Sequence, residues 1–148
     1  MISPSAQYDL VFVGAGHSHA LALRMLAMKP VPGLRLTLVS PDSLSAYSGM
    51  LPGLVAGHYR LEHTHIDLRR LCQAVGARFI RARVERLNAQ QRRLYLDDGT
   101  RLEYDLVSLD VGATPDLISV PGARQHAVAV KPVADFHRRW QALRDTLA

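Results

Sequence analysis

The chain has 148 residues, of which 48% are hydrophobic and 21% charged, with a formal net charge of +5 and a single cysteine, Cys72. This composition is typical of a folded domain with its own core, and it excludes an internal disulfide, a CxxC redox pair and a cysteine-rich metal site. No apolar run approaches the ~20 residues that span a bilayer, and the first residues do not resemble a secretory leader. We therefore expect a cytoplasmic, reducing location.

The basic residues are concentrated between Arg60 and Arg101, where they follow a helical segment and alternating strands. They form no compact run and no aromatic residues interleave with them, so the pattern favours a solvated face and no nucleic acid as partner. A basic domain also suits an anionic cofactor or contact with acidic lipid.

The first forty residues predict a βαβ unit. Tyr8–Val13 (YDLVFV) is a short apolar run typical of a buried parallel strand, and the glycine-containing turn Gly14–His19 (GAGHSH) follows at once. Ala20–Met28 predicts a helix, which Lys29-Pro30 ends, and Leu34–Val39 predicts a second strand.

The next segments predict a loop and two helical stretches. Ser40–Arg60 is irregular and leads into a short helix, whereas His65–Val75 places apolar side chains at helical spacing, with Gly76 as its C-cap. A three-stranded antiparallel meander follows, with Asp97-Asp98-Gly99 as a hairpin turn. The elements predicted from there on are the meander strands Arg78–Leu87, Arg92–Leu96 and Arg101–Glu103, a buried strand Tyr104–Leu109, a short strand Ala127–Val130 and a helix Pro132–Leu147.

The Gly14–His19 turn carries the clearest chemistry. A pyrophosphate needs backbone N–H groups close to its oxygens, Gly14 permits the tight turn, and Gly16 lets the phosphate approach the main chain. The following helix directs its N-terminal N–H groups and its dipole at the anion. A GxGxxG pattern alone is a weak signal, but here a strand precedes it and a helix follows it.

Two positions depart from this pattern. His19 stands where a third small residue is usual, which implies either a wider helix–strand approach or a ring that points toward the cofactor. Ser40 stands at the end of the second strand, where an acidic residue usually binds the ribose, and Asp42 lies two residues on. No arginine follows directly, which disfavours a 2′-phosphate at this site.

These residues resemble the N-terminal FAD domain of the pyridine nucleotide-disulfide oxidoreductase superfamily. In that superfamily a β-meander replaces a crossover helix, and the next strand ends in an A-T-G-x-x-P type turn. Here the meander spans Arg83–Glu103 and the turn is Asp110-Val111-Gly112-Ala113-Thr114-Pro115. The resemblance implies an α/β fold, a Rossmann-like three-layer FAD/NAD(P)-binding domain with a parallel central sheet and an antiparallel three-stranded meander. It also favours FAD over NAD at this site.

Within the superfamily the chain is most similar to the type II NADH dehydrogenase-like branch, and closest to the flavoprotein linked to selenide, water dikinase. The shared marks are GAGHSH, SPDSLSAYSGMLPGLVAGHY, and Val130-Lys131-Pro132 followed by Phe136 and Trp140. His19 fits this subgroup. The resemblance implies cofactor-binding positions in five places: the pyrophosphate turn Gly14, Ala15, Gly16, His17, Ser18 and His19; the ribose end Ser40, Pro41 and Asp42; the flavin side Gly49, Met50 and Leu51; the adenine contact Arg83 and Val84; and the closing turn Gly112 and Ala113.

The same resemblance implies a longer parent protein. Such flavoproteins continue into an NAD(P)H-binding domain and return with a G-D motif, neither of which is present here. We therefore expect residues 1–148 to be the FAD-binding domain and a fragment of a longer flavoprotein with two dinucleotide-binding domains. The parent would be an NAD(P)H-dependent oxidoreductase passing electrons through FAD to a quinone or another acceptor. Peripheral contact with the inner face of the membrane and a functional link to selenide, water dikinase are further expectations.

Two alternatives for the function stay open. Instead of an FAD-binding domain, the chain could be an NAD(P)-binding domain of a dehydrogenase, against which the meander argues, or a non-catalytic module kept for protein contacts in selenium metabolism. No side chain stands out as a catalytic acid or base.

Several single residues are of types that bind metals or take part in catalysis. The histidines His17, His19, His58, His63 and His65 lack tetrahedral ligand spacing, so we expect no metal. Cys72 lies on an apolar helix face and is expected to be a core thiol. Asp110 is either a flavin-site residue or a turn former at the strand end.

Overall fold

The computed structural model describes residues 7–147, which form two compact units. Unit 1 comprises residues 7–45 and 65–111, and unit 2 comprises residues 46–64 and 112–147. Unit 1 contains the predicted βαβ unit and the meander, so it carries most of the predicted site.

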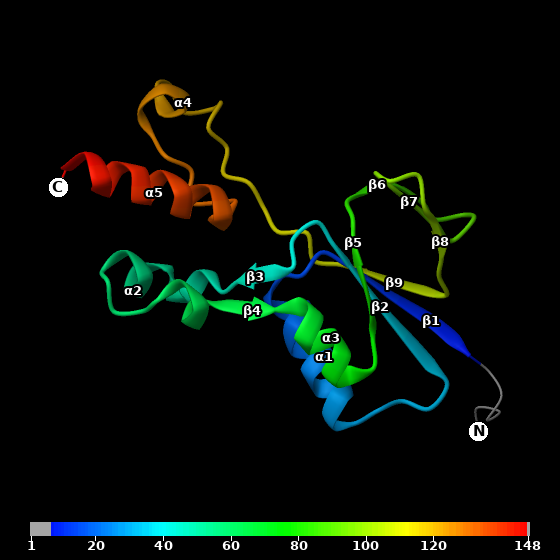
Figure 1. Cartoon of the computed structure of the whole chain (residues 1–148). Helices are drawn as coiled ribbons and strands as arrows, with labels where there is room; N and C mark the ends of the chain where they lie inside the picture. Colours follow the sequence, from blue (N-terminus) through cyan, green and yellow to red (C-terminus); the bar gives the residue numbers. More distant parts are fainter. Residues whose placement is uncertain (1–6, 148) are drawn as a thin grey trace. The chain divides into compact units, whose positions relative to one another are not determined.

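A parallel sheet lies at the centre of unit 1 (Figure 1). Its strands are β1 (Tyr8–Val13), β2 (Leu34–Ser40), β5 (Arg78–Arg81) and β9 (Leu106–Leu109), in the spatial order β5-β2-β1-β9. Every neighbouring pair runs parallel. The strands predicted from the apolar runs are therefore present, with the same bounds for β1. The prediction that Tyr104–Leu109 is a buried strand is wrong in part, because β9 begins at Leu106 and lies at the edge of the sheet, where Leu106 is 62% and Leu109 60% exposed.

Helices cover one face of this sheet and the meander covers the other (Figure 1). Phe12 and Leu38 pack with α1 (His17–Met28) and α3 (Leu68–Val75), because successive strand residues point to opposite faces. On the other face Val11 and Val13 contact the meander, whose strands are β6 (Val84–Asn88), β7 (Arg93–Leu96) and β8 (Arg101–Glu103). The predicted three-layer α/β fold is confirmed.

The helix predicted over His65–Val75 is shorter than expected. Its first residues form β4 (His65–Asp67), which pairs with β3 (Leu44–Ala46) in a separate two-stranded sheet, and α3 begins at Leu68. Asp67 is the reason, because its carboxylate accepts hydrogen bonds from the N–H groups of Arg69 and Arg70 as an N-cap. The C-terminal prediction is confirmed, since Gly76 has φ +68°.

The strand predicted over Arg78–Leu87 is two strands in different sheets. β5 belongs to the parallel sheet and β6 to the meander, and the chain turns at Ala82 and Arg83 between them. The turn is held by a hydrogen bond from the Ala82 N–H to the Ser40 carbonyl and another from the Arg83 N–H to the Asp97 carboxylate. The hairpin predicted at Asp97–Gly99 joins β7 to β8.

Unit 2 consists of short helices and one longer helix. They are η1 (Ser48–Met50), α2 (Leu51–Val55), η2 (Leu61–Thr64), α4 (Ala123–His126) and α5 (Val133–Leu147). The short helix after Ser40 and the helix following Pro132 are confirmed. The strand predicted over Ala127–Val130 is wrong, because that segment is extended without a strand partner in the described chain and follows the unpredicted α4.

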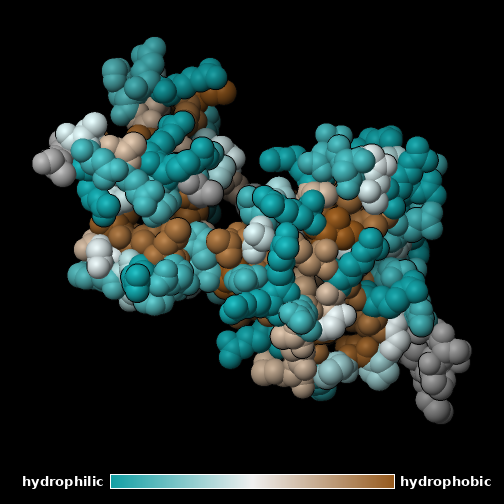
Figure 2. Space-filling view, in the orientation of Figure 1, coloured by the Kyte–Doolittle hydropathy of each residue, from teal (hydrophilic) through white to brown (hydrophobic). Residues whose placement is uncertain are grey.

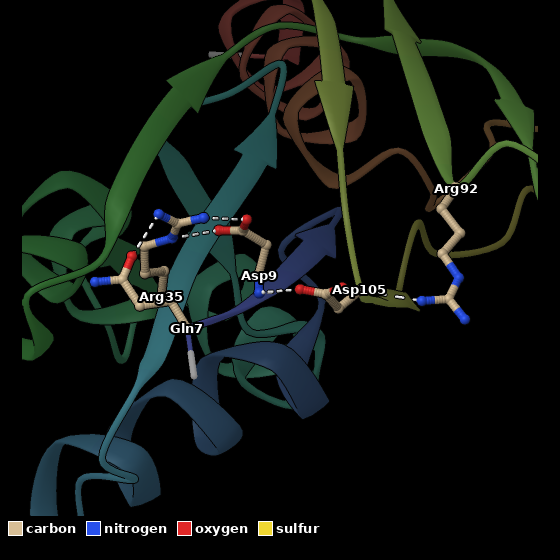
Figure 3. Close-up of polar contacts among 5 residues, drawn as sticks. All are labelled: Gln7, Asp9, Arg35, Arg92 and Asp105. Atoms are coloured by element: carbon tan, nitrogen blue, oxygen red, sulfur yellow. Dashed lines mark hydrogen bonds and ion pairs between the residues drawn. The ribbon is translucent and has the colours of Figure 1, made fainter. Parts of the chain in front are cut away.

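A cluster of ion pairs joins the amino ends of the strands in unit 1 (Figure 3). The Arg35 guanidinium donates to both carboxylate oxygens of Asp9 and to the side-chain carbonyl of Gln7, and the Asp9 N–H donates to Asp105. The Arg35 hydrogen bond lowers the pKa of the Asp9 carboxyl. This cluster lies at the strand ends opposite the glycine turn, so it supports the sheet and not the site.

Among the described residues, no helix is both long and apolar enough to cross a membrane. Figure 2 shows hydrophilic residues over the meander, at the upper right of the view.

Cys72 is a core residue, as predicted. Its side chain is 1% exposed among Phe12, Leu23, Leu38 and Leu68, and its thiol is free. Burial disfavours the thiolate and raises the pKa of Cys72 to about 11.

This burial predicts a pH dependence of stability. The folded chain holds the thiol proton up to a pKa of about 11, whereas an exposed thiol releases it near the ordinary value of 9.0. Because the folded state then binds more protons, the stability from this group is complete below about pH 9 and falls as the pH rises toward 11. Denaturant unfolding of wild type and Cys72→Ala across this range measures it. The gap in stability between them should narrow with rising pH, and a constant gap would contradict the assignment.

Candidate functional site

The glycine turn lies at the carboxyl end of β1, between the ends of β2 and β9. The Gly14 N–H donates to the Val39 carbonyl at 2.9 Å, and the Gly16 N–H donates to the Asp110 carbonyl at 3.2 Å. The chain leaves β1 toward β2 on one side and reaches β9 through the meander on the other. Ligands of open α/β sheets bind at such a point, where the strand order reverses.

Gly14 has two independent reasons to be glycine. Its φ is +83°, a conformation that side chains disfavour, and a Cβ there would lie 2.2 Å from the Asp110 carbonyl oxygen and 2.8 Å from the Val111 Cα. The main chain at the end of β9 therefore approaches the turn as closely as the absence of a side chain allows. This confirms the tight turn predicted from the sequence.

Gly16 is the N-cap of α1, and its missing side chain leaves room for a carboxylate. A Cβ on Gly16 would lie 2.2 to 2.3 Å from the carboxylate atoms of Asp110, and one carboxylate oxygen accepts from the His19 N–H at 3.3 Å. The first turn of α1 has no acidic residue and Gly16 supplies no side-chain cap. Asp110 is thus the anion at this helix N-terminus.

His19 begins the buried part of α1. Its side chain is 3% exposed, its Nδ1 lies 2.8 Å from the Gly14 carbonyl oxygen, and its Nε2 lies 2.9 Å from the Ser108 hydroxyl. The ring also contacts Phe12, with 4.6 Å between ring centroids. Because a carbonyl only accepts, Nδ1 donates, and in the neutral ring Nε2 accepts from Ser108. The possibility that the ring points out toward a cofactor is therefore wrong. The ring is buried between α1 and the sheet and links the turn to β9 through its two hydrogen bonds.

Ser45 is a second contact that the sequence did not single out. Its hydroxyl donates to the Ala15 carbonyl, which joins β3 to the middle of the glycine turn. Like the Ser108 hydroxyl, it comes from a segment distant in the chain. Only a three-dimensional arrangement brings such partners together.

The predicted ribose end lies beside the turn. Ser40 is buried at the end of β2, next to Val39, which bonds Gly14. Pro41 accepts a hydrogen bond from the Arg81 side chain at 3.1 Å, and Asp42 is exposed. The exposed Asp42 carboxylate is the acidic group nearest in sequence to the end of β2.

At the predicted adenine contact, the main chain of Arg83 already makes two hydrogen bonds to Asp97. The Arg83 N–H donates to the Asp97 carboxylate at 3.0 Å, and the Arg83 carbonyl accepts from the Asp97 N–H at 2.9 Å. The second lone pair of that carbonyl remains as a main-chain acceptor for an amino group. Val84 pairs with Leu96 in the meander.

The remaining predicted positions lie in unit 2. Gly49 is exposed, Met50 is half-buried and Leu51 is buried, so Leu51 supports the fold of this unit. Gly112 has φ +78° with open space where a Cβ would stand, and Ala113 is exposed. Their roles in binding stay predictions.

The backbone of unit 1 fits the pyrophosphate of a dinucleotide. Gly14 and Gly16 carry no side chains of their own, and α1 presents its N-terminus at the switch point of the sheet. The one group that stands in this place is the Asp110 carboxylate. In the described part of the chain, no three histidine, cysteine or acidic side chains are gathered as a metal would require.

Comparison with known proteins gives distant relatives. No family model matches the chain. The chain is 23% identical over 143 residues to the mitochondrial external alternative NAD(P)H-ubiquinone oxidoreductase B4 of Arabidopsis thaliana, covering 90% of this chain and 24% of that protein. The chain thus spans about a quarter of this relative's length.

Three solved structures share its fold. Sulfide:quinone oxidoreductase of Aquifex aeolicus matches with a TM-score of 0.77 at 19% identity, covering 93% of this chain and 32% of that one. NDH2 of Plasmodium falciparum, in complex with NADH, matches at 0.73 and 16%, covering 89% and 28%. Reduced CoADR-RHD of Bacillus anthracis matches at 0.72 and 17%, covering 95% and 27%. The chain therefore has the same Rossmann-like α/β fold as these three proteins.

The close approach at Gly14 is tested with a matched pair of variants. Gly14→Ala and Gly99→Ala both place a side chain at positive φ, but a Cβ at Gly99 has nothing within 4 Å. Positive φ alone costs roughly 1–2 kcal/mol, whereas the overlap with main chain at Gly14 should raise the loss above about 4 kcal/mol. Urea unfolding measures both losses. Equal losses of unfolding free energy in the two variants would show that the main chain at the end of β9 does not exclude a side chain at Gly14.

Proposed function

We propose that the chain is the FAD-binding part of an NAD(P)H-dependent flavoprotein oxidoreductase, which passes electrons to a quinone or another acceptor. The observation that carries the proposal is the Gly14–Gly16 turn at the N-terminus of α1, at the end of the sheet where the strand order reverses. A single turn of this kind would suit any dinucleotide.

Two further observations favour FAD. In chain order the meander β6-β7-β8 follows β5 and precedes β9. This is the connection at which the superfamily that the sequence resembles differs from a plain NAD domain. The similar proteins are named as an NAD(P)H-ubiquinone oxidoreductase, a sulfide:quinone oxidoreductase and an NADH-bound NDH2. Quinones recur among them, which supports a quinone as the acceptor of the whole protein.

The residues of the glycine turn would hold the pyrophosphate through main-chain N–H groups, and Ser40 with Asp42 would receive the ribose hydroxyls. Arg83 and Val84 would face the adenine, while Gly49–Leu51 and Gly112-Ala113 of unit 2 would contact the flavin side. When bound, FAD supplies the redox chemistry. The chain itself would bind and orient the group.

This chain covers 24% to 32% of the length of the relatives above, so the activity of a whole protein of that kind is part of the proposal. The NAD(P)H site would lie in a further part of such a protein. A membrane-peripheral location and a link to selenide, water dikinase rest on the sequence motifs alone.

Cofactor choice is tested by titrating the purified 148-residue chain with FAD, ADP-ribose, NAD and adenosine, using calorimetry and thermal unfolding. FAD and ADP-ribose should bind, and FAD at 100 times its Kd should stabilise the fold by about 2.7 kcal/mol. Adenosine lacks a pyrophosphate and should bind far more weakly. Tighter binding of NAD than of FAD would instead favour a dehydrogenase domain, and no binding of any dinucleotide would favour the non-catalytic module.

A further inference from the structure

We propose that Asp110 is a built-in anion of the dinucleotide site, one that occupies the place of the pyrophosphate and weakens its binding. The inference rests on the proposed function and goes beyond it by assigning a role to a residue of this chain. It makes the affinity for the cofactor dependent on the charge of one carboxylate.

The first observation is the place that the carboxylate fills. In a dinucleotide turn the second glycine has no side chain so that the pyrophosphate can approach the backbone. In this chain the space of a Gly16 side chain is filled by the Asp110 carboxylate, with all three of its atoms 2.2 to 2.3 Å from where a Cβ would stand. A phosphate oxygen and this carboxylate cannot share that space.

The second observation is the hydrogen bond that the carboxylate makes. One Asp110 oxygen accepts from the N–H of His19 in the first turn of α1, a turn without an acidic residue of its own. The N–H groups of the first helical turn are the donors that a bound phosphate uses. The carboxylate therefore takes the same kind of donor as the ligand would.

The third observation is that the carboxylate can leave without unfolding the site. The Asp110 N–H donates to the Val13 carbonyl at 2.9 Å and its carbonyl accepts from Gly16 at 3.2 Å, so the main chain is anchored on both sides. Displacement then requires only rotation of a short side chain. The turn stays in shape, but the carboxylate remains near a ligand of the same charge sign, and that repulsion opposes binding.

The ring of His19 does not offset this repulsion. The side chains facing it from the glycine turn and α1 include His19, whose ring is turned inward to Gly14 and Ser108, and no described ion pair involves Asp110. Replacing the carboxylate by an amide keeps an oxygen for the His19 N–H and removes only the charge. Asp110→Asn therefore separates the charge from the cap.

The test compares wild type, Asp110→Asn and Asp110→Ala by calorimetry with ADP-ribose, FAD and inorganic pyrophosphate at low and high salt. Asp98→Asn is the matched control, because Asp98 also accepts a backbone N–H, from Thr100, and lies in the exposed hairpin. At low salt Asp110→Asn should bind ADP-ribose about tenfold more tightly than wild type, and the gap should shrink in high salt. Asp98→Asn should stay within about twofold of wild type, because the exposed Asp98 carboxylate takes no part in capping α1 and its charge is screened by solvent.

The outcomes separate the two proposals. Asp110→Ala should also bind more tightly but unfold at a lower temperature without ligand, because it loses the cap as well as the charge. If wild type binds ADP-ribose and Asp110→Asn binds it equally or more weakly, Asp110 is a cap or a ligand contact and this inference is overturned while the proposed function stands. If neither wild type nor Asp110→Asn binds FAD or ADP-ribose, the proposed function is overturned as well.

Discussion

The rest of the site depends on the close approach between the end of β9 and the glycine turn after β1. The Asp110 carbonyl accepts the Gly16 N–H, and the Asp110 main chain lies where a Gly14 side chain would be. This contact brings the ends of β1 and β9 and the start of α1 to one point. Glycine is required there because main chain, and not a flexible side chain, fills the space.

His19 shows how the chain accommodates a large residue at a position where a small one is usual. Its ring fills the space between α1 and the sheet, bonds the Gly14 carbonyl and the Ser108 hydroxyl, and contacts Phe12. A histidine in this place needs polar partners, since a buried ring nitrogen without one is costly. Ser108 on the neighbouring strand supplies one, so the two residues act as a pair across the turn.

The order of elements in unit 1 could be predicted from the sequence, because hydrophobic period and glycine position are local signals. Errors arose where the deciding partner was distant or where one residue ended an element. Asp67 caps α3 and shortens a helix predicted from His65, and the link from Arg83 to Asp97 splits one predicted strand into two. The glycine turn was predicted, but the position of the Asp110 carboxylate was not, since 91 residues separate it from His19.

The central claim is that the turn at Gly14–His19 receives a pyrophosphate. Amide NMR of the isotope-labelled chain, titrated with ADP-ribose, tests it most directly because each backbone N–H reports its own contact. The largest shifts should occur at the amides of the turn and the first turn of α1, while Gly76, which shares the positive φ of Gly14 but caps the C-terminal end of α3, should stay unchanged. Shifts confined to the meander or to α5, with the turn unaffected, would contradict it.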